Sequence, residues 1–168
     1  GIETFIPTPL KIEYLNLLLQ VGFHTIDFGS FVSPKAIPQL KDTADVLNGL
    51  ALDNTKSKLL SIVANLRGAQ EACVFQQIYY LGFPLSLSEA FQQRNTNKSI
   101  AEAYPLISEI QNLCMQHGKA LVVYLSMGFG NPYGDPWNVE IVGEWTEKLS
   151  NLGVKILSLS DTVGSSTP

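Results

Sequence analysis

The chain has 168 residues, of which 45% are hydrophobic, which is enough to bury one substantial core in a single domain spanning residues 1–168. Its 11 basic residues are outnumbered by 15 acidic ones, so it offers no basic surface to attract nucleic acid. No apolar run reaches the eighteen or so residues of a membrane span, and residues 1–4 lack the features of a secretory signal. The composition predicts a soluble globular protein that binds neither nucleic acid nor membranes.

Five apolar runs rich in β-branched or aromatic residues are predicted to be buried strands. They are His24–Phe28, Lys58–Ala64, Gln77–Phe83, Leu121–Met127 and Val154–Leu159. Because the runs are continuous rather than alternating, they indicate a parallel sheet covered on both faces. Helical patterns separate the runs, and the strand ends recur at roughly 20 to 40 residues, which fits repeated βαβ units.

Three of the predicted helices carry recognisable start signals. Two are a capping residue followed by proline, and the third is a capping box, in which two side chains each satisfy an orphan amide. The pairs are Thr8 with Pro9, Ser99 with Glu102, and Asp135 with Pro136, the last preceding a helix expected over residues 139–149.

The two cysteines and two histidines show no metal-site spacing. Cys73 and Cys114 lie on segments predicted to be separate helices, and neither has a neighbouring His or basic cluster that would favour the thiolate. We expect free thiols in a reducing compartment. His24 precedes a strand and His117 lies near a helix end, so capping or solvent contact is favoured over metal binding.

The order of elements fits two α/β architectures. A complete (β/α)₈ barrel needs about 250 residues, and this chain supplies material for only five or six of its units. An incomplete barrel would leave two exposed sheet edges, which favour association. Five parallel strands are also compatible with a self-contained doubly wound sheet. Strand order is not readable from one sequence, so these alternatives stay open at this point.

Polar residues follow the first strand in the run Ile26–Lys35, which reads IDFGSFVSPK. An acid and a hydroxyl at the end of a buried strand occupy the face where α/β barrels keep their chemistry. The sequence of this run resembles the 3-hydroxy-3-methylglutaryl-CoA lyases, which belong to the metal-dependent lyases and synthases that share a TIM barrel. The later run Leu157–Gly164, LSLSDTVG, followed by Thr167-Pro168, looks like another strand end of the same family. The resemblance covers nearly the whole chain.

The resemblance implies a parallel-strand (β/α) TIM barrel that is incomplete in this chain, with about five strands present and the first and last units missing. It also implies a carbon–carbon lyase that cleaves 3-hydroxy-3-methylglutaryl-CoA to acetyl-CoA and acetoacetate, as in leucine degradation and ketone-body formation. The expected cofactor is a divalent cation, Mg²⁺ or Mn²⁺, and the expected partner is an acyl-CoA substrate, with a homodimer left open. The expected location is the cytoplasm, or the mitochondrial matrix in a eukaryote.

The resemblance further implies roles for individual residues. Asp27, where the family usually has Glu, would be the acid that assists proton transfer. Because Asp is one methylene shorter than Glu, its carboxylate lies closer to the backbone by about one carbon–carbon bond, ~1.5 Å. Arg67, in Asn-Leu-Arg-Gly where the family has Asn-Leu-Lys-Gly, and Asn95 would contact the coenzyme. The substrate contacts would be Ser30, Tyr124, Ser158, Asp161 and Thr162. Asn131 stands where many members have Cys, so no thiol acts at that position.

Each of these assignments has a plainer structural alternative. Asp27 could face solvent or cap a helix, and Ser30 could form a turn. Arg67 could be an unpartnered surface residue, and Asn95 could stabilise a loop. Tyr124 could be a core residue with a satisfied hydroxyl, and the pair at 161–162 could cap a following helix.

The family's metal site uses an Asp paired with a neighbouring Arg, a His-x-His and an Asn, and its catalytic cysteine lies in a glycine-rich loop. None of these occurs in residues 1–168. The cation ligands are therefore expected outside this chain, which is not expected to turn over substrate alone. Two other functions stay open. One is a sister acyl-CoA condensing synthase or aldolase of the same barrel group. The other is a non-catalytic acyl-CoA binding fragment.

Overall fold

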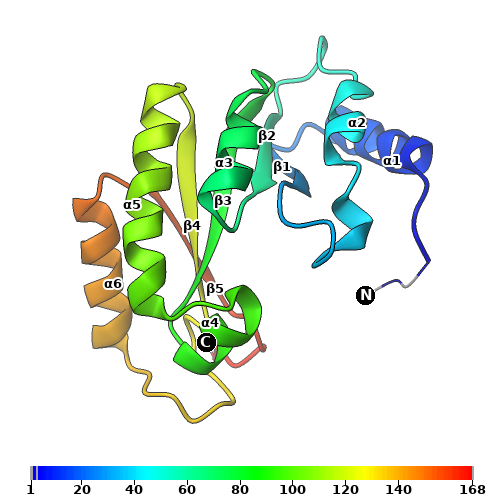
Figure 1. Ribbon diagram of the computed structural model, residues 1–168. Coiled ribbons are helices and arrows are strands. Elements are labelled where there is room, and N and C mark those ends of the chain that lie inside the picture. The colour runs from blue at the N-terminus through cyan, green and yellow to red at the C-terminus, as the bar shows by residue number, and fades with distance from the viewer. Residues whose placement is uncertain (1, 3, 168) are drawn as a thin grey trace.

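The computed structural model describes residue 2 and residues 4–167, so the Pro168 of the second motif lies outside the described part (Figure 1). Its centre is one five-stranded sheet in which every neighbouring pair is parallel. The strands are β1 (Thr25–Ser30), β2 (Lys58–Ile62), β3 (Ile78–Ser86), β4 (Ala120–Ser126) and β5 (Ile156–Ser160). All five predicted strands are confirmed, with ends that differ by up to three residues.

Helices connect each strand to the next, and two α-helices lie between β3 and β4. The helices are α1 (Thr8–Val21), α2 (Thr43–Asn48), α3 (Leu66–Cys73), α4 (Glu89–Thr96), α5 (Ile100–Gln116) and α6 (Val139–Asn151), with a short 3₁₀ helix at Pro38–Leu40. Among the described residues, no helix combines the length and apolar character needed to cross a bilayer.

Strand order decides between the two architectures. The strands lie in the order β1-β2-β3-β4-β5, so each strand is beside the next one in sequence. A doubly wound sheet reverses its strand order at a switch point, and this sheet does not. The fold is therefore an arc of a parallel (β/α) barrel, and β1 and β5 are the edges of the described sheet.

The two faces of the sheet differ in how they are covered. The main core lies between the sheet and the helices and includes the fully buried Leu81, Phe83 and Val123. The opposite, concave face carries only a small cluster of Leu60, Tyr80 and Val122. The sequence predicted a sheet covered on both faces, and the described helices cover one of them. The concave face is the one that lines the interior of a barrel, where apolar strands face other strands.

The helix starts were predicted with mixed success. The capping box of Ser99 and Glu102 is confirmed, with both of its hydrogen bonds formed. Thr8 is not an N-cap: it is the first residue of α1, and its hydroxyl donates to Asp42 Oδ2 at 2.7 Å. Its partner lies 34 residues away, so the local pattern could not reveal it.

The start of α6 is also capped differently from the prediction. Its N-cap is Asn138, whose Oδ1 accepts from the Ile141 amide at 2.8 Å. Asp135 instead reaches the start of α4. As predicted, Cys73 and Cys114 lie on different helices, α3 and α5, and both are free and buried.

Candidate active site

The carboxyl ends of the strands bring a row of hydroxyl groups to one edge of the sheet. Ser86 at the end of β3 is in register with Ser126 of β4, which is in register with Ser160 of β5. Asp161 and Thr162 follow directly. This edge is the one at which α/β barrels place their catalytic groups, and it lies at the end of the sheet next to α4 in Figure 1.

Tyr124 projects onto the concave face, where Ser158 is its register neighbour on β5. The two residues line one cavity of about 260 Å³ together with Leu60 and Tyr80. Tyr124 is half-buried, and burial raises the pKa of its hydroxyl; the negative charge of Asp27 raises that pKa further. Tyr124, Ser158 and Asp27 therefore share one face of the sheet, as the predicted site requires.

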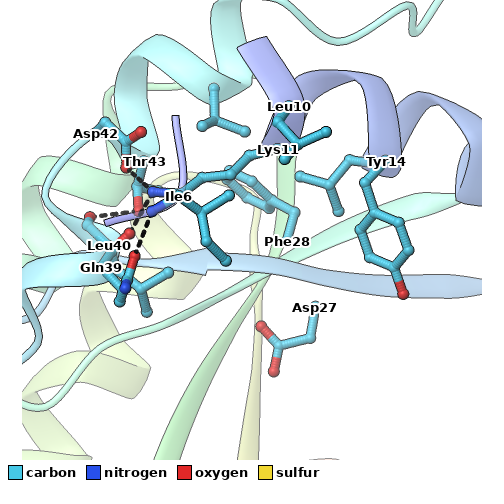
Figure 2. Close-up of a pocket in the computed structure, with 12 residues that line it drawn as sticks. Ile6, Leu10, Lys11, Tyr14, Asp27, Phe28, Gln39, Leu40, Asp42 and Thr43 are labelled. Atoms are coloured by element: carbon cyan, nitrogen blue, oxygen red, sulfur yellow. Dashed lines mark hydrogen bonds and ion pairs between the residues drawn. The ribbon is translucent and has the colours of Figure 1, made fainter. Parts of the chain in front are cut away.

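Asp27 lies on β1, next to the point where the pairing with β2 is irregular. Figure 2 shows its carboxylate beneath the strand, pointing away from the apolar side chains of α1. The side chain keeps solvent access, yet the protein atoms around it desolvate the carboxylate and raise its pKa to about 6. A carboxyl group that titrates near neutral pH is suited to accept and return a proton.

A second cavity, of about 540 Å³, lies between α1, α2 and the edge strand β1 (Figure 2). Its walls are mainly apolar, and Asp27 is the one predicted site residue among those that line it. At the far end Lys11 Nζ lies 2.7 Å from Asp42 Oδ1. Because this cavity faces the helices rather than the carboxyl ends of the strands, we place the candidate active site on the concave face.

Ser30 ends β1 and is buried, with its hydroxyl used by the backbone. Its Oγ donates to the Ile62 carbonyl at 3.0 Å and accepts from the Val32 amide at 3.2 Å. These contacts match the turn-forming alternative. A contact between Ser30 and substrate stays a prediction.

The two predicted coenzyme residues lie on neighbouring units. Arg67 is exposed in the first turn of α3 and pairs with Glu71, with Nη1 to Oε1 at 2.6 Å. Such exposed i,i+4 pairs are weak, so the guanidinium remains available to another anion. Asn95 is exposed on α4, in the unit after β3. Both side chains are accessible, but their coenzyme contacts stay predictions.

Asp161 and Thr162 organise the chain after β5. The Asp161 carboxylate accepts from the Ser166 hydroxyl at 2.7 Å and the Ser165 amide at 2.8 Å, and these bonds hold its pKa below the usual range. Thr162 Oγ1 accepts from the Met127 amide at 2.8 Å. Asp161 thus holds the turn that follows β5, and no helix for it to cap begins within the described residues up to 167. Thr162 joins the ends of β4 and β5.

Comparison with known proteins shows which proteins this chain resembles. No protein-family model matches the chain. The hydroxymethylglutaryl-CoA lyase YngG of Bacillus subtilis is 34% identical over 173 residues, which cover 98% of this chain and 54% of YngG. The mouse mitochondrial hydroxymethylglutaryl-CoA lyase is 31% identical over 99% of this chain and 50% of its own length. The crystal structure of the Bacillus subtilis lyase superposes with a TM-score of 0.92 over 99% of this chain and 55% of that one, at 32% identity.

The chain is homologous to half of a hydroxymethylglutaryl-CoA lyase. The resemblance and the barrel fold inferred from the sequence are therefore confirmed, and the chain spans about half the length of the curated relatives it matches. A lyase from Acinetobacter baumannii, in complex with coenzyme A and 3-methylmalate, superposes with a TM-score of 0.90 at 30% identity, over 99% of this chain and 53% of its own.

The described residues do not by themselves form the cation site that the lyase family implies. Within residues 2 and 4–167, no three side chains of His, Cys, Asp or Glu gather closely enough to hold a metal ion. Asp27 and Asp161 are separate, and Asp161 is occupied by its own turn. We therefore derive no step through a metal from these residues.

Sequence reasoning missed one residue of this region. Asp135 lies in the long loop between β4 and α6 and accepts from the Ser88 hydroxyl at 2.5 Å and the Ala90 amide at 2.9 Å. In the sequence it had the pattern of a cap for α6. Its true partners are 45 and 47 residues away, and no local signal identifies them.

Proposed function

We propose that the protein carrying this sequence is a hydroxymethylglutaryl-CoA lyase, which cleaves 3-hydroxy-3-methylglutaryl-CoA to acetyl-CoA and acetoacetate. The observation that carries this proposal is the match of 98% of the chain to curated lyases, together with the close superposition on their structures. The coenzyme A and 3-methylmalate bound by the Acinetobacter baumannii lyase support an acyl-CoA with a hydroxy-acid portion as the substrate.

The reaction begins with loss of the proton from the substrate's tertiary hydroxyl, after which the carbon–carbon bond breaks to give acetoacetate and the enolate of acetyl-CoA. We assign Asp27 to assist this proton transfer, since its pKa of about 6 leaves it able to exchange a proton near neutral pH. Tyr124 and Ser158, which share the concave face with Asp27, would contact the acyl portion.

The remaining predicted contacts lie at the carboxyl ends of the strands. Ser30, Asp161 and Thr162 would border the acyl portion there, and Arg67 and Asn95 would contact the coenzyme. Arg67 offers a planar fork of donors that suits a phosphate. A divalent cation, Mg²⁺ or Mn²⁺, would be held by residues outside this chain.

The proposal extends to the setting of the protein. Relatives with mitochondrial and cytoplasmic names support one of these two compartments. Roles in leucine degradation and ketone-body formation are proposed from the sequence resemblance. Association through the sheet edges, including a homodimer, is a further expectation, since unpaired parallel edges favour pairing.

The test is to express this sequence with its natural flanking regions and measure acetoacetate released from 3-hydroxy-3-methylglutaryl-CoA with and without Mg²⁺ or Mn²⁺. We expect cation-dependent release, and none from residues 1–168 alone. Condensation of acetyl-CoA with an oxo acid, without cleavage, would instead show a sister synthase. Binding of coenzyme A with neither reaction would show a non-catalytic binding protein.

A further inference from the structure

The loop between β4 and α6 is attached to the start of α4. Asp135 Oδ2 accepts from the Ser88 hydroxyl at 2.5 Å and from the Ala90 amide at 2.9 Å. Ser88 is the N-cap of α4, and its Oγ also accepts from the Phe91 amide at 3.2 Å. One carboxylate thus completes the cap of a helix that begins 46 residues earlier in the chain.

The chemistry of this contact suits a carboxylate. The first amides of a helix have no partner within the helix, and the helix dipole favours negative charge at that end. The hydrogen bond from Ser88, followed by that from Ala90, holds the pKa of Asp135 below its usual range. Asp135 is therefore ionised at neutral pH, and its bonds to α4 are of the stronger, charge-assisted kind.

A second contact joins the same loop to α4 through the side chain of Tyr133. The ring of Tyr133 stacks on Phe91, with centroids 6.2 Å apart. The Arg94 guanidinium lies over the Tyr133 ring, 4.8 Å from its centroid. The loop after β4 therefore contacts α4 at its first turn and again at the turn that carries Asn95.

The loop is also shaped by its own hydrogen bonds, so it can act as a stiff support. Asn131 Oδ1 accepts from the amides of Tyr133 and Asp135 at 3.0 and 3.1 Å, and its Nδ2 donates to the Asp135 carbonyl at 2.9 Å. The Trp137 indole donates to the Gly128 carbonyl at 3.1 Å. The residue that replaces the family's frequent Cys thus fixes the backbone next to Asp135.

We propose that Asp135 is a positioning residue, which holds α4 against the loop after β4 and thereby sets Asn95 for contact with the coenzyme portion of the substrate. This inference rests on the proposed function. Figure 1 shows the loop passing alongside α4 at the carboxyl end of the sheet. Asp135 itself touches neither substrate nor coenzyme; it acts through the helix.

The test uses the protein carrying this sequence with its natural flanking regions, and coenzyme A as the probe. We expect Asp135→Ala to weaken coenzyme A binding by about tenfold in isothermal titration. In an Asn95→Ala background, the same substitution should bring little further loss of coenzyme A affinity, because both changes remove the same contact between Asn95 and the coenzyme. Hydrogen exchange should show faster opening of residues 89–96. Glu102→Gln, which weakens the cap of α5 instead, is the matched control and should leave binding unchanged.

The inference would be overturned if the losses of coenzyme A affinity caused by Asp135→Ala and Asn95→Ala were fully additive. It would also be overturned if Asp135→Ala speeded hydrogen exchange in α4 but left coenzyme A binding unchanged. Both outcomes leave the proposed function standing, because the unsubstituted protein binds coenzyme A in each. Failure of the unsubstituted protein to bind coenzyme A would contradict the proposed function itself, and this inference with it.

Discussion

The ring of Tyr124 lies so close above Gly82 that a β-carbon at position 82 would sit 2.9 Å from Tyr124 Cε2. The same β-carbon would lie 2.7 Å from Ile62 Cδ1. Both distances are shorter than carbon atoms tolerate. The absent side chain of Gly82 therefore creates the space in which the tyrosine lies on the concave face.

Replacing Gly82 with alanine should displace Tyr124. We expect Gly82→Ala to lower the free energy of unfolding by about 1–3 kcal/mol through overpacking, and to impair substrate binding more than coenzyme A binding. Urea denaturation and the two binding titrations check this. Gly143→Ala is the control, since a β-carbon there meets nothing within 4 Å and should stabilise α6 by up to ~1 kcal/mol. Equal effects of the two substitutions would refute the crowding explanation.

The raised pKa of Asp27 predicts how stability depends on pH. The pKa of Asp27 is about 6 in the folded protein, whereas in the unfolded chain it has the ordinary carboxyl value of 3.8. The folded state therefore binds more protons between these values, and stability should fall as pH rises from about 4 to 6. Asp27→Asn should remove this fall and be more stable than the unsubstituted protein at pH 7. Denaturant midpoints of both proteins at pH 4 and pH 7 test this prediction. If the midpoint of Asp27→Asn fell between the two pH values as much as that of the unsubstituted protein, the raised pKa of Asp27 would be contradicted.

Lys11 and Asp42 form a buried ion pair at 2.7 Å, with side chains only 14% and 8% exposed (Figure 2). Burial alone would raise the pKa of Asp42, but hydrogen bonds from Lys11 and Thr8 hold it below its usual range. The ionised Asp42 carboxylate should therefore stabilise the folded protein at pH values above the ordinary carboxyl pKa. This stabilisation should be lost as the pH falls through the lowered pKa of Asp42 in the folded protein.

Removing the cation of this pair should leave the buried Asp42 carboxylate without its charged partner. We expect Lys11→Met to cost about 3–5 kcal/mol in the free energy of unfolding, measured by urea denaturation at pH 7. The exposed pair of Arg67 and Glu71 serves as the comparison, where Glu71→Gln should cost less than ~1 kcal/mol. Similar costs for the two substitutions would show that burial does not set the strength of the Lys11 contact.

Thr162 supports a strained residue at the end of β4. Met127 has a φ of +58°, a region that non-glycine residues rarely occupy, and its amide donates to Thr162 Oγ1 at 2.8 Å. We expect Thr162→Val to cost about 1–2 kcal/mol by removing the acceptor of a buried amide. Thr162→Ser, which keeps the hydroxyl acceptor, should recover most of that loss, as judged by thermal unfolding. A Thr162→Ser variant as unstable as Thr162→Val would argue against a role for this hydrogen bond.

The fold was predictable where local pattern carries the information. The capping box of Ser99 and Glu102 and the five strands depend on neighbours in sequence, and both are confirmed. The edge on which Ser160, Asp161 and Thr162 gather followed from the parallel strands alone, because their carboxyl ends meet at one edge. Individual contacts of these side chains did not follow.

What could not be predicted depends on residues far apart in the chain. Thr8 and Asp135 both carry a capping pattern, yet Asp42 takes the hydroxyl of Thr8, and the start of α4 takes Asp135. The close approach of Tyr124 to Gly82 depends on the register of β3 and β4. Each of these contacts is set by tertiary packing, which outweighs a local preference worth about 1 kcal/mol.

Acetoacetate formation from 3-hydroxy-3-methylglutaryl-CoA is the most direct test, measured for the protein with its natural flanking regions and for its Asp27→Asn variant. The account predicts cation-dependent cleavage by the former, at a rate that rises through about pH 6, and a loss of at least 100-fold in kcat for the variant. Absence of cleavage in the unsubstituted protein with cation supplied, or full activity of Asp27→Asn, would contradict it.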